Sequence, residues 1–504
     1  MIPITFGKYK ELWACVVSLL IISQCCFAQE TKSTDKFSDN VQNIPGISVD
    51  ESVDKPAQNI MDFSLSRDSF GEANKSQYDW LSLHTQLTYL SMWHDSIKNK
   101  SQNQIQPGAN NLDPASELKS TFDATLLVGF RLAEHTAFFV NPEIDQGFGL
   151  SNTVGLAGFP SGSAYKVGQK EPYGRIPRAF LRQTFNLGGE KELIEEGPNQ
   201  FANEVTHNNL TLTVGKFSVV DIFDTNRYSH DPRADFMNWS VLDSGAFDYA
   251  ADSWGFTYGL AAEWRQENWT LRTGLFDLSS IPNSEKLDSS FKQYEWVNEI
   301  ERRYFVGQRE GSLKLLAYVN RGFMGSYIDA VSLAVNSRTS ANCPTLASSS
   351  PASTSCVRQF ASQGGIALNL EQELSRSTGF FARLSANQGK KETYDFTEIN
   401  QSLAAGLVFQ GSSWGRGGDT VGTAGVVNAL TADARKYFSA GGVGILIGDG
   451  WQNYGQEMIS ETYYNARLSN HITSSLDFQY VVNPAYNRDR GPVSILGIRL
   501  HLEF

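Results

Sequence analysis

Hydrophobic and polar residues alternate with a period of two along most of this chain, and the pattern is clearest in its last segment. The apolar positions there are Leu496, Ile498, Leu500, Leu502 and Phe504. The positions between them include three ionisable residues, Arg499, His501 and Glu503. A strict period of two predicts a β-strand with one apolar and one polar face. Taken alone, such a strand fits a soluble β-sandwich as well as an outer-membrane β-barrel.

The same alternation recurs along the chain and predicts about 16 strands. The expected strands are 80–89, 122–131, 136–145, 176–187, 208–217, 254–265, 269–278, 296–306, 312–320, 364–373, 378–387, 400–410, 440–448, 456–469, 472–483 and 493–504. Two of them, 296–306 and 440–448, alternate poorly. Bacterial single-chain barrels require an even number of strands. About 16 strands leave an aqueous channel, whereas about eight would be filled by side chains.

Aromatic and charged side chains favour a membrane barrel over a soluble fold. The predicted outer face of 254–264 is Trp254, Phe256, Tyr258, Leu260, Ala262 and Trp264. Aromatic residues at both strand ends match the girdles that flank the apolar band of a membrane barrel. The polar strand faces carry charges of both signs, and a charge facing lipid costs about 2–4 kcal/mol at mid-membrane. We therefore predict an all-β fold, a closed antiparallel transmembrane β-barrel with long external loops and short periplasmic turns.

The N-terminus has the layout of a secretory signal peptide. Lys8 and Lys10 precede an apolar run over 12–22, and a small-residue cleavage site ends at Ala28. The run is too short for a membrane anchor. Gln24 and Cys25 are poor residues before an acylated cysteine, which disfavours a lipoprotein. We predict cleavage of residues 1–28 and export to the bacterial outer membrane.

Beyond the signal peptide, the sequence divides into two parts. Residues 29–75 are rich in Ser, Asp, Asn and Lys, and we expect a flexible or periplasmic lead-in. The barrel domain is expected over 76–504. Some of its long connections, predicted at 146–175, 218–253, 321–363 and 411–439, are expected to fold inward and narrow the channel. A short helix is expected over 428–439, ending near Gly441.

Charge and cysteine content limit the possible partners. The chain has 42 basic and 54 acidic side chains, a net charge of −12, and loss of residues 1–28 would make it −13. An acidic balance disfavours nucleic acid and mildly favours cations over anions as permeants. Cys343 and Cys356 remain after cleavage, in a loop rich in Ser and Ala, and they predict a disulfide. No histidine accompanies this pair at zinc-ligand spacing, so we expect no metal and no cofactor.

Several blocks of the chain resemble the carbohydrate-selective porins of the OprB type. The most specific block is NPEIDQGFGLSNTVGLAGFPSG at 141–162. The other blocks are GANNL (108–112), RAFLRQTF (178–185), GKFSVVDIFDTNRYSHDPRADFMNW (215–239), FDYAAD (247–252), GGVGILIGDG (441–450) and TSSLDFQYVVNP to LHLEF at the end. The resemblance spans about residues 78–504, and only the lead-in and the cysteine loop depart from it.

This resemblance implies an outer-membrane barrel of about 16 strands that lets sugars diffuse into the periplasm. The preference for sugars comes only from the resemblance. The last strand, with Phe504, looks like the strand that the outer-membrane assembly machinery reads in such barrels. The barrel would be surrounded by outer-membrane lipid. Trimers are common in porins, so a homotrimer is a further expectation.

Six polar residues are candidates for contact with a sugar in the channel. Sugar hydroxyls call for charged or amide groups along the wall, and apolar C–H faces call for aromatic rings. The candidates are Asn141, Glu143, Arg182, Glu371, Arg383 and Arg467. Arg182 and Gln183 point to opposite faces of one strand, and we assign Arg182 to the lumen. For each candidate the alternative is a wall charge that is paired with a neighbour and indifferent to solute.

Other functions remain as alternatives at this point. A general, non-selective porin would share the fold. A hydrolase embedded in the barrel would need a His–Ser or Asp–His pair, and none of the seven histidines lies in a nucleophile motif such as G-x-S-x-G. His84 and His501 would lie on neighbouring strands of a closed barrel, which is a weak catalytic hint. The stretch DIFDTNRYSHD (221–231) offers oxygen ligands for calcium, but a hydrogen-bonded turn is favoured because the spacing fits no known loop. An adhesin would show no solute flux.

Overall fold

The computed structural model describes residues 79–97, 109–164, 168–336, 339–343, 350–395, 397–450 and 452–504. The signal peptide predicted at 1–28 and the lead-in predicted at 29–75 lie outside these residues. Among the described residues, no helix is both long and apolar enough to cross a bilayer.

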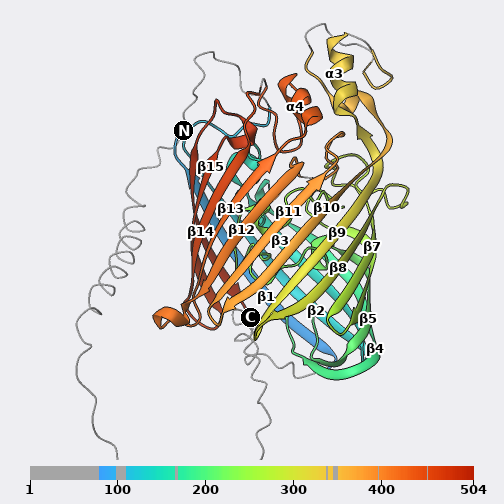
Figure 1. The fold of residues 1–504 in the computed structure, drawn as a ribbon, viewed down its shortest axis with the longest axis vertical. Helices are drawn as coiled ribbons and strands as arrows, with labels where there is room; N and C mark the ends of the chain where they lie inside the picture. Colours follow the sequence, from blue (N-terminus) through green and yellow to red (C-terminus); the bar gives the residue numbers. More distant parts are fainter. Residues whose placement is uncertain are drawn as a thin grey trace, which may run out of the picture. The chain divides into compact units, whose positions relative to one another are not determined.

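The described residues form a closed antiparallel barrel of 16 strands, as the alternation predicts (Figure 1). The strands are β1 (Leu81–His94), β2 (Glu117–Ala133), β3 (Thr136–Gly147), β4 (Gln169–Ile194), β5 (Asn203–Phe217), β6 (Thr257–Gln266), β7 (Trp269–Asp277), β8 (Tyr294–Val306), β9 (Arg309–Gly325), β10 (Arg358–Ser375), β11 (Thr378–Asn387), β12 (Gln401–Gln410), β13 (Thr420–Ala429), β14 (Glu457–Arg467), β15 (Ile472–Val482) and β16 (Val493–Glu503). Each strand pairs with its neighbours in sequence, and β1 pairs with β16.

The first and last strands close the barrel through backbone hydrogen bonds. Phe504 N donates to Thr85 O, and Thr85 N donates to Phe504 O, each at 2.8 Å. The ring of Phe504 stacks on His471, with ring centroids 5.1 Å apart. Because closure leaves no unpaired strand edge, every strand of the described barrel has two partners.

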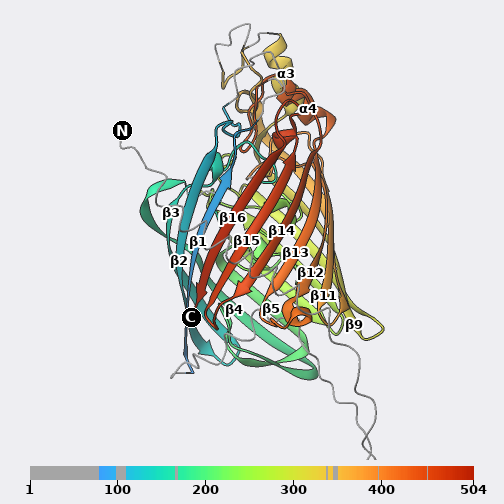
Figure 2. The same ribbon diagram turned by 90° about the vertical axis from the view of Figure 1, so that its left-hand side faces the viewer.

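The two ends of the barrel differ in the length of their connections (Figure 2). At one end, turns such as 134–135, 267–268 and 307–308 join the strands. At the other end, the loops 218–256, 326–357 and 430–456 are long. The described helices all lie in loops of this second end, and they are α2 (Trp239–Leu242), α3 (Tyr327–Val335) and α4 (Ala432–Ser439). Short 3₁₀ turns occur at Leu150–Asn152, Val219–Asp221, Thr354–Val357, Gly411–Trp414 and Pro484–Tyr486.

Apolar side chains cover the outside of the barrel, and polar side chains point inward. On β16, Leu496 is 41% exposed and Leu500 is 37% exposed, whereas Arg499 between them is 1% exposed. The same division holds on β15, where Phe478 faces outward and Asp477 is buried inside. A charge that faces lipid is costly, so this pattern is what a bilayer requires of a barrel wall.

Two details of the strand prediction are wrong. Residues 440–448 form a loop, and the thirteenth strand lies at Thr420–Ala429, inside a segment expected to be a long loop. Strand β13 has small residues on both faces, so it shows no alternation of large apolar and polar side chains. In the other segment, the consecutive residues Leu446 and Ile447 are both buried, which a strand with two distinct faces does not allow.

The predicted aromatic face of 254–264 is correct only within the strand. Strand β6 begins at Thr257, and Tyr258 and Trp264 are outward and about half exposed. Trp254 and Phe256 belong to the preceding loop. The Trp254 indole donates to the hydroxyl of Tyr173 at 3.1 Å, and Phe256 lies beneath an arginine side chain.

The helix expected over 428–439 is shorter than predicted. It is α4, which begins after Thr431, whose side chain accepts a hydrogen bond from Ala434 N. Residues 428 and 429 complete β13 instead. Gly441 follows the helix with φ +79°, a conformation that suits a glycine after a helix end.

Candidate functional site

The loop 218–256 between β5 and β6 folds into the lumen. Its apolar residues Phe236, Met237 and Val241 are fully buried against the inside of the wall. The ring of Phe236 packs edge-on against Tyr463 of β14 at 4.9 Å. The prediction that a loop narrows the channel therefore has its structural counterpart in this segment.

Polar groups of the wall hold this inward loop by its backbone. Glu299 of β8 accepts a hydrogen bond from Asp224 N at 2.8 Å. Glu461 of β14 accepts one from Met237 N at 2.5 Å. Arg383 of β11 donates to Val241 O at 2.8 Å and to Ser229 O at 2.7 Å. The loop is thus bound to strands that lie on different sides of the barrel.

On the side of β2, β3 and β4, the loop and the wall meet in a cluster of arginines and carboxylates. We call this the arginine–carboxylate cluster, and it consists of Asp123, Glu143, Asp145, Arg175, Arg178, Asp221 and Arg233. The pairs are Arg175–Glu143 and Arg175–Asp145 at 2.5 Å each, Arg178–Asp221 at 2.6 Å, Arg233–Asp123 at 3.0 Å and Arg233–Glu143 at 3.6 Å.

The arginines of this cluster face the lumen more than most of its carboxylates do. The side chains of Arg175, Arg178 and Arg233 are 19–21% exposed, whereas that of Glu143 is 2% exposed. A guanidinium has five N–H donors in a fixed plane, so a paired arginine keeps donors for a second partner. The arginines of the cluster therefore keep partly exposed hydrogen-bond donors.

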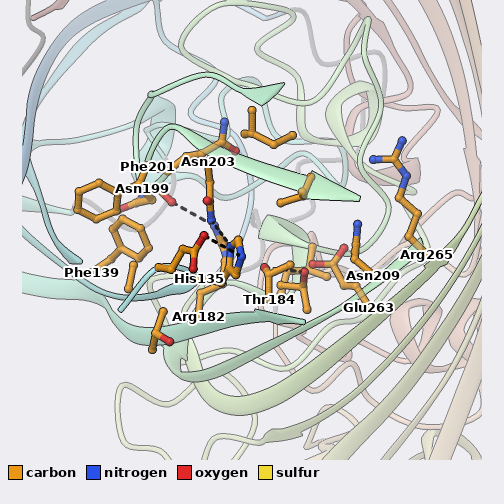
Figure 3. Close-up of a pocket in the computed structure, with 18 of the residues that line it drawn as sticks. His135, Phe139, Arg182, Thr184, Asn199, Phe201, Asn203, Asn209, Glu263 and Arg265 are labelled. Atoms are coloured by element: carbon orange, nitrogen blue, oxygen red, sulfur yellow. Dashed lines mark hydrogen bonds and ion pairs between the residues drawn. The ribbon is translucent and has the colours of Figure 1, made fainter. Parts of the chain in front are cut away.

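A cavity of about 390 Å³ lies on the lumen side of β3 to β8, toward the end of the short turns (Figure 3). Its lining combines arginines, amides, hydroxyls and aromatic rings. Lining residues from the wall and turns include Arg131, His135, Phe139, Arg182, Thr184, Asn199, Phe201, Asn203, Asn209, Thr211, Glu263, Arg265, Arg272 and Arg303. The inward loop contributes Asp221 and Ile222. Asp221 also belongs to the arginine–carboxylate cluster, so the two regions are continuous.

The six residues predicted to contact solute occupy different environments. Arg182 lines the cavity, and Glu143 belongs to the arginine–carboxylate cluster. Asn141 is completely buried, and its amide has no hydrogen-bond partner among the described residues. Glu371 accepts a hydrogen bond from Arg227 N at 2.8 Å. Arg383 is 2% exposed and contacts the loop.

Arg467 lies at the short-turn end of β14, where its backbone N–H donates to Asp419 and its guanidinium donates to Ser469 O at 3.3 Å. Gln183 takes the opposite face from Arg182, as predicted, because it bonds Thr136 and does not line the cavity. The structure therefore brings only part of the predicted set near one path.

Sequence reasoning missed the loop partners of the cluster, Asp221 and Arg233, and the wall residue Arg178 of β4. These three residues lie in blocks that were noted for the resemblance, but nothing in their spacing shows that the loop turns inward. The stretch 221–231 forms hydrogen-bonded turns, in which the Asp224 carboxylate accepts bonds from Ser244. His501 bonds Thr88, whereas His84 lies beyond the end of the β1–β16 pairing, so the two histidines are not opposite each other.

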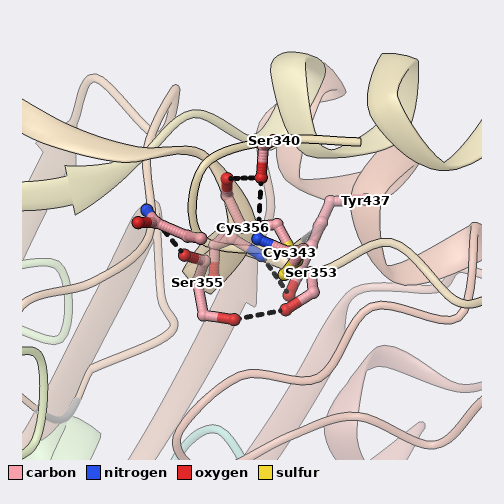
Figure 4. Close-up of a disulfide and its surroundings, with 8 residues drawn as sticks. Ser340, Cys343, Ser353, Ser355, Cys356 and Tyr437 are labelled. Atoms are coloured by element: carbon pink, nitrogen blue, oxygen red, sulfur yellow. Dashed lines mark hydrogen bonds between the residues drawn. A yellow bond between two sulfur atoms is a disulfide. The ribbon is translucent and has the colours of Figure 1, made fainter. Parts of the chain in front are cut away.

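At the end of the long loops, the segments around α3 and α4 pack against each other and join the core cluster of the inward loop. A disulfide joins Cys343 to Cys356, with a Cα–Cα distance of 5.2 Å (Figure 4). Ser340 supports it by donating to Cys356 O at 2.7 Å. Tyr327 of α3 packs on Tyr437 of α4, with ring centroids 4.8 Å apart.

A buried carboxylate links two loops at this end. Glu398 accepts hydrogen bonds from Leu446 N at 2.7 Å and Ile447 N at 2.9 Å. Burial of this carboxylate raises its pKa to about 7, against the effect of these hydrogen bonds. We therefore expect the connection between the loops to weaken as the pH rises through about 7.

Comparison with known proteins identifies the family. Residues 109–504 match the family described as "Carbohydrate-selective porin, OprB family". The chain belongs to this family. The match covers most of the chain, including the inward loop, and agrees with the resemblance of the individual blocks. The protein is therefore an outer-membrane channel that admits carbohydrates, and porins are channels rather than enzymes.

The chain is similar to several solved structures, and of the following three, one has a TM-score above 0.5. The high-pH structure of Pseudomonas putida OprB is similar with a TM-score of 0.63 at 14% identity, over 84% of this chain and 94% of that chain. The low-pH structure of that protein gives a TM-score of 0.44 at 10% identity, over 84% and 93%. Pseudomonas aeruginosa OccK11 gives 0.41 at 9% identity, over 84% and 96%. The first of these supports the barrel fold. A search of curated proteins finds no match.

Proposed function

We propose that this OprB-family porin conducts monosaccharides and small oligosaccharides by passive diffusion, and that the inward loop makes it selective. The observation that carries the proposal is the position of loop 218–256, which is bound to β8, β11 and β14 and meets the opposite wall at the arginine–carboxylate cluster. A solute must pass between polar groups that face each other across a narrow space.

The chemistry of this passage suits a sugar. Hydroxyl groups can accept hydrogen bonds from Arg175, Arg178 and Arg233, and they can donate to carboxylates such as Glu143. Most donors and acceptors of the cluster are already paired, so each contact with a solute is weak. Several weak contacts in sequence allow entry and release, which conduction requires.

We assign different roles to the six predicted residues. Glu143 and Arg182 are proposed to contact solute, because they belong to the cluster and the cavity. Arg383 is proposed to position the loop, and Glu371 to assist it through Arg227 N. Asn141 is completely buried beside Glu143 on β3, so we propose that it supports the wall from within and does not contact solute directly. Arg467 is proposed to stabilise the turn after β14.

Export and assembly complete the proposal. The signal peptide over 1–28 would direct the chain to the periplasm, and the barrel-assembly machinery would recognise the last strand through Phe504. Residues 29–75 would remain as a periplasmic lead-in. Association into trimers, expected from porins in general, is checked by the mass of the purified particle in detergent.

Liposome swelling tests the transport proposal. Reconstituted protein is compared with empty liposomes for glucose, a disaccharide and an amino acid of similar size to glucose. We expect swelling to be faster with glucose than with the amino acid. Equal rates would make the protein a general porin, and no swelling would refute the channel.

A further inference from the structure

The cavity near the short turns is lined by two arginines that form no ion pair with a carboxylate among the described residues, Arg131 and Arg182. Arg182 Nη1 donates to Asn199 O at 3.1 Å, and its Nε lies 3.5 Å from the hydroxyl of Thr213. Its guanidinium lies over the ring of Phe180 at 5.1 Å. Within the described residues, no carboxylate oxygen lies within the 4.0 Å that defines an ion pair with this side chain.

The other arginines of the cavity are engaged. Arg272 pairs with Glu263, Glu299 and Glu301 at 2.8–2.9 Å. Arg265 pairs with Glu192 at 2.8 Å. Arg303 lies 3.6 Å from Glu301.

Two further charged residues of the lining are bound to protein groups. Arg131 donates hydrogen bonds to the backbone carbonyls of Asp79, Glu134 and Ala202. Asp221, the nearby acid on the loop, is bound to Arg178 in a two-hydrogen-bond pair. All three guanidinium nitrogens of Arg131 are thus bonded, whereas Arg182 Nη2 makes no hydrogen bond within the part of the chain that the structure describes. Arg182 is therefore the arginine of this cavity that keeps a donor nitrogen and has no ion-pair partner.

The groups around Arg182 are those that recognise a sugar. Thr184 and Thr211 share a hydrogen bond at 3.0 Å and keep further capacity for a hydroxyl partner. The side-chain oxygen of Asn199 has no hydrogen-bond partner among the described residues. Phe139 and Phe201 supply apolar surface, and Figure 3 shows them on the same side of the cavity as Asn199.

We propose that this cavity is a subsite for sugars that carry a carboxylate, such as hexonates and hexuronates. The carboxylate pairs with Arg182, and the hydroxyl groups bond Thr184, Thr211 and Asn199. This inference rests on the proposed function, because the sugar reaches the cavity through the channel. A site for anionic sugars contrasts with the net negative charge of the whole chain, which by itself favours the passage of cations.

The test is uptake of radiolabelled gluconate and glucose into proteoliposomes that contain the full-length protein. The variant Arg182→Gln removes the charge and keeps a hydrogen-bonding side chain of moderate length. The matched control is Arg265→Gln, because Arg265 lines the same cavity but already has Glu192 as its partner. Glutamate serves as an anion of similar charge without the hydroxyl groups of a sugar.

We expect Arg182→Gln to lower the gluconate-to-glucose uptake ratio roughly tenfold, the value of one charge-assisted hydrogen bond. Arg265→Gln should lower it much less, and glutamate uptake should respond little to either variant. An unchanged ratio in Arg182→Gln, with glucose uptake intact, would overturn the proposal and leave the sugar channel standing. An equal loss for glutamate would overturn the assignment to sugars. Absence of glucose uptake in the unmodified protein would refute the proposed function itself.

Discussion

Arg383 fastens the inward loop to strand β11, so its removal should widen the pore. The guanidinium donates to Val241 O at 2.8 Å, to Ser229 O at 2.7 Å and to Asp224 O at 3.3 Å, and it lies 3.7 Å from the Asp224 carboxylate. The variant Arg383→Met keeps the length of the side chain and removes every one of these contacts. The carbonyls and the carboxylate then remain buried without this partner.

The magnitude follows from the kind of interaction that is lost. Removing one partner of a buried charge pair typically costs about 3–5 kcal/mol. A loss of about 3 kcal/mol raises the population of a locally open loop roughly 100-fold. Glu461 and Glu299 still hold neighbouring parts of the loop, so we expect local opening around 224–243 rather than release of the whole segment.

Single-channel recording in planar bilayers is the appropriate assay. Arg383→Met should show a larger mean conductance with frequent fluctuations, and a trisaccharide that the unmodified channel excludes should swell liposomes. The matched control is Arg321→Met, because Arg321 stacks on Phe360 of the neighbouring strand and contacts no residue of the loop in the described structure. Conductance and exclusion equal to those of the unmodified channel would refute the anchoring role. If Arg383→Met fails to assemble, Glu461→Gln tests the same loop from β14.

Three other predictions concern the loops and the closure of the barrel. Because the pKa of Glu398 is raised to about 7 by burial, its contribution to stability is complete below the unfolded value of 4.5 and is lost as the pH rises through about 7. Hydrogen-exchange protection of the amides of 445–447 should fall over this pH range, and Glu398→Gln should abolish the pH dependence of this protection. A pH dependence that persists in Glu398→Gln would contradict the assignment of the effect to Glu398. The Cys343–Cys356 disulfide closes a short loop, and its loss should cost about 3 kcal/mol of local stability. The double variant Cys343→Ser, Cys356→Ser should therefore be cleaved faster by protease within 326–357, with unchanged glucose flux. Protease resistance equal to that of the oxidised protein would contradict this role of the disulfide. Phe504→Ala removes the ring stacked on His471 and the aromatic group proposed for assembly, and we expect less folded barrel in outer-membrane fractions by heat-modifiable gel mobility. His471→Ala separates the two effects, because it removes the stacking and the hydrogen bond between His471 Nδ1 and Glu503 O but keeps the terminal aromatic ring.

The barrel could be predicted from sequence because a membrane wall repeats one simple rule. Each strand gives its apolar side chains to lipid, so residues such as Leu496 and Phe478 mark a strand without any knowledge of its partners. The rule failed where side chains are small, as at β13, and where two adjacent residues are buried in a loop, as at Leu446 and Ile447. The predicted number of strands was still correct, because the missed strand Thr420–Ala429 and the falsely predicted strand 440–448 cancel in the count.

The site could be predicted only in part, because the loop that forms it obeys no periodicity. The alternation assigns Glu143 and Arg182 to the lumen, but it cannot show that Asp221 and Arg233 approach them from a loop about 40–90 positions away in sequence. The same limitation explains Arg383. Its inward direction follows from the strand, whereas its contact with the loop backbone depends on tertiary packing. A charge on the wall can therefore be located from sequence, but its role as anchor or solute contact requires the structure.

The central claim is that sugars pass through the lumen in contact with polar groups between the inward loop and the wall. The most direct measurement is the ion current through single channels while glucose is added to one side. Glucose should reduce the current reversibly, in proportion to the fraction of time that a glucose molecule occupies the channel. An amino acid of similar size should reduce the current much less. Equal reductions by the two solutes, or none by glucose, would contradict the claim.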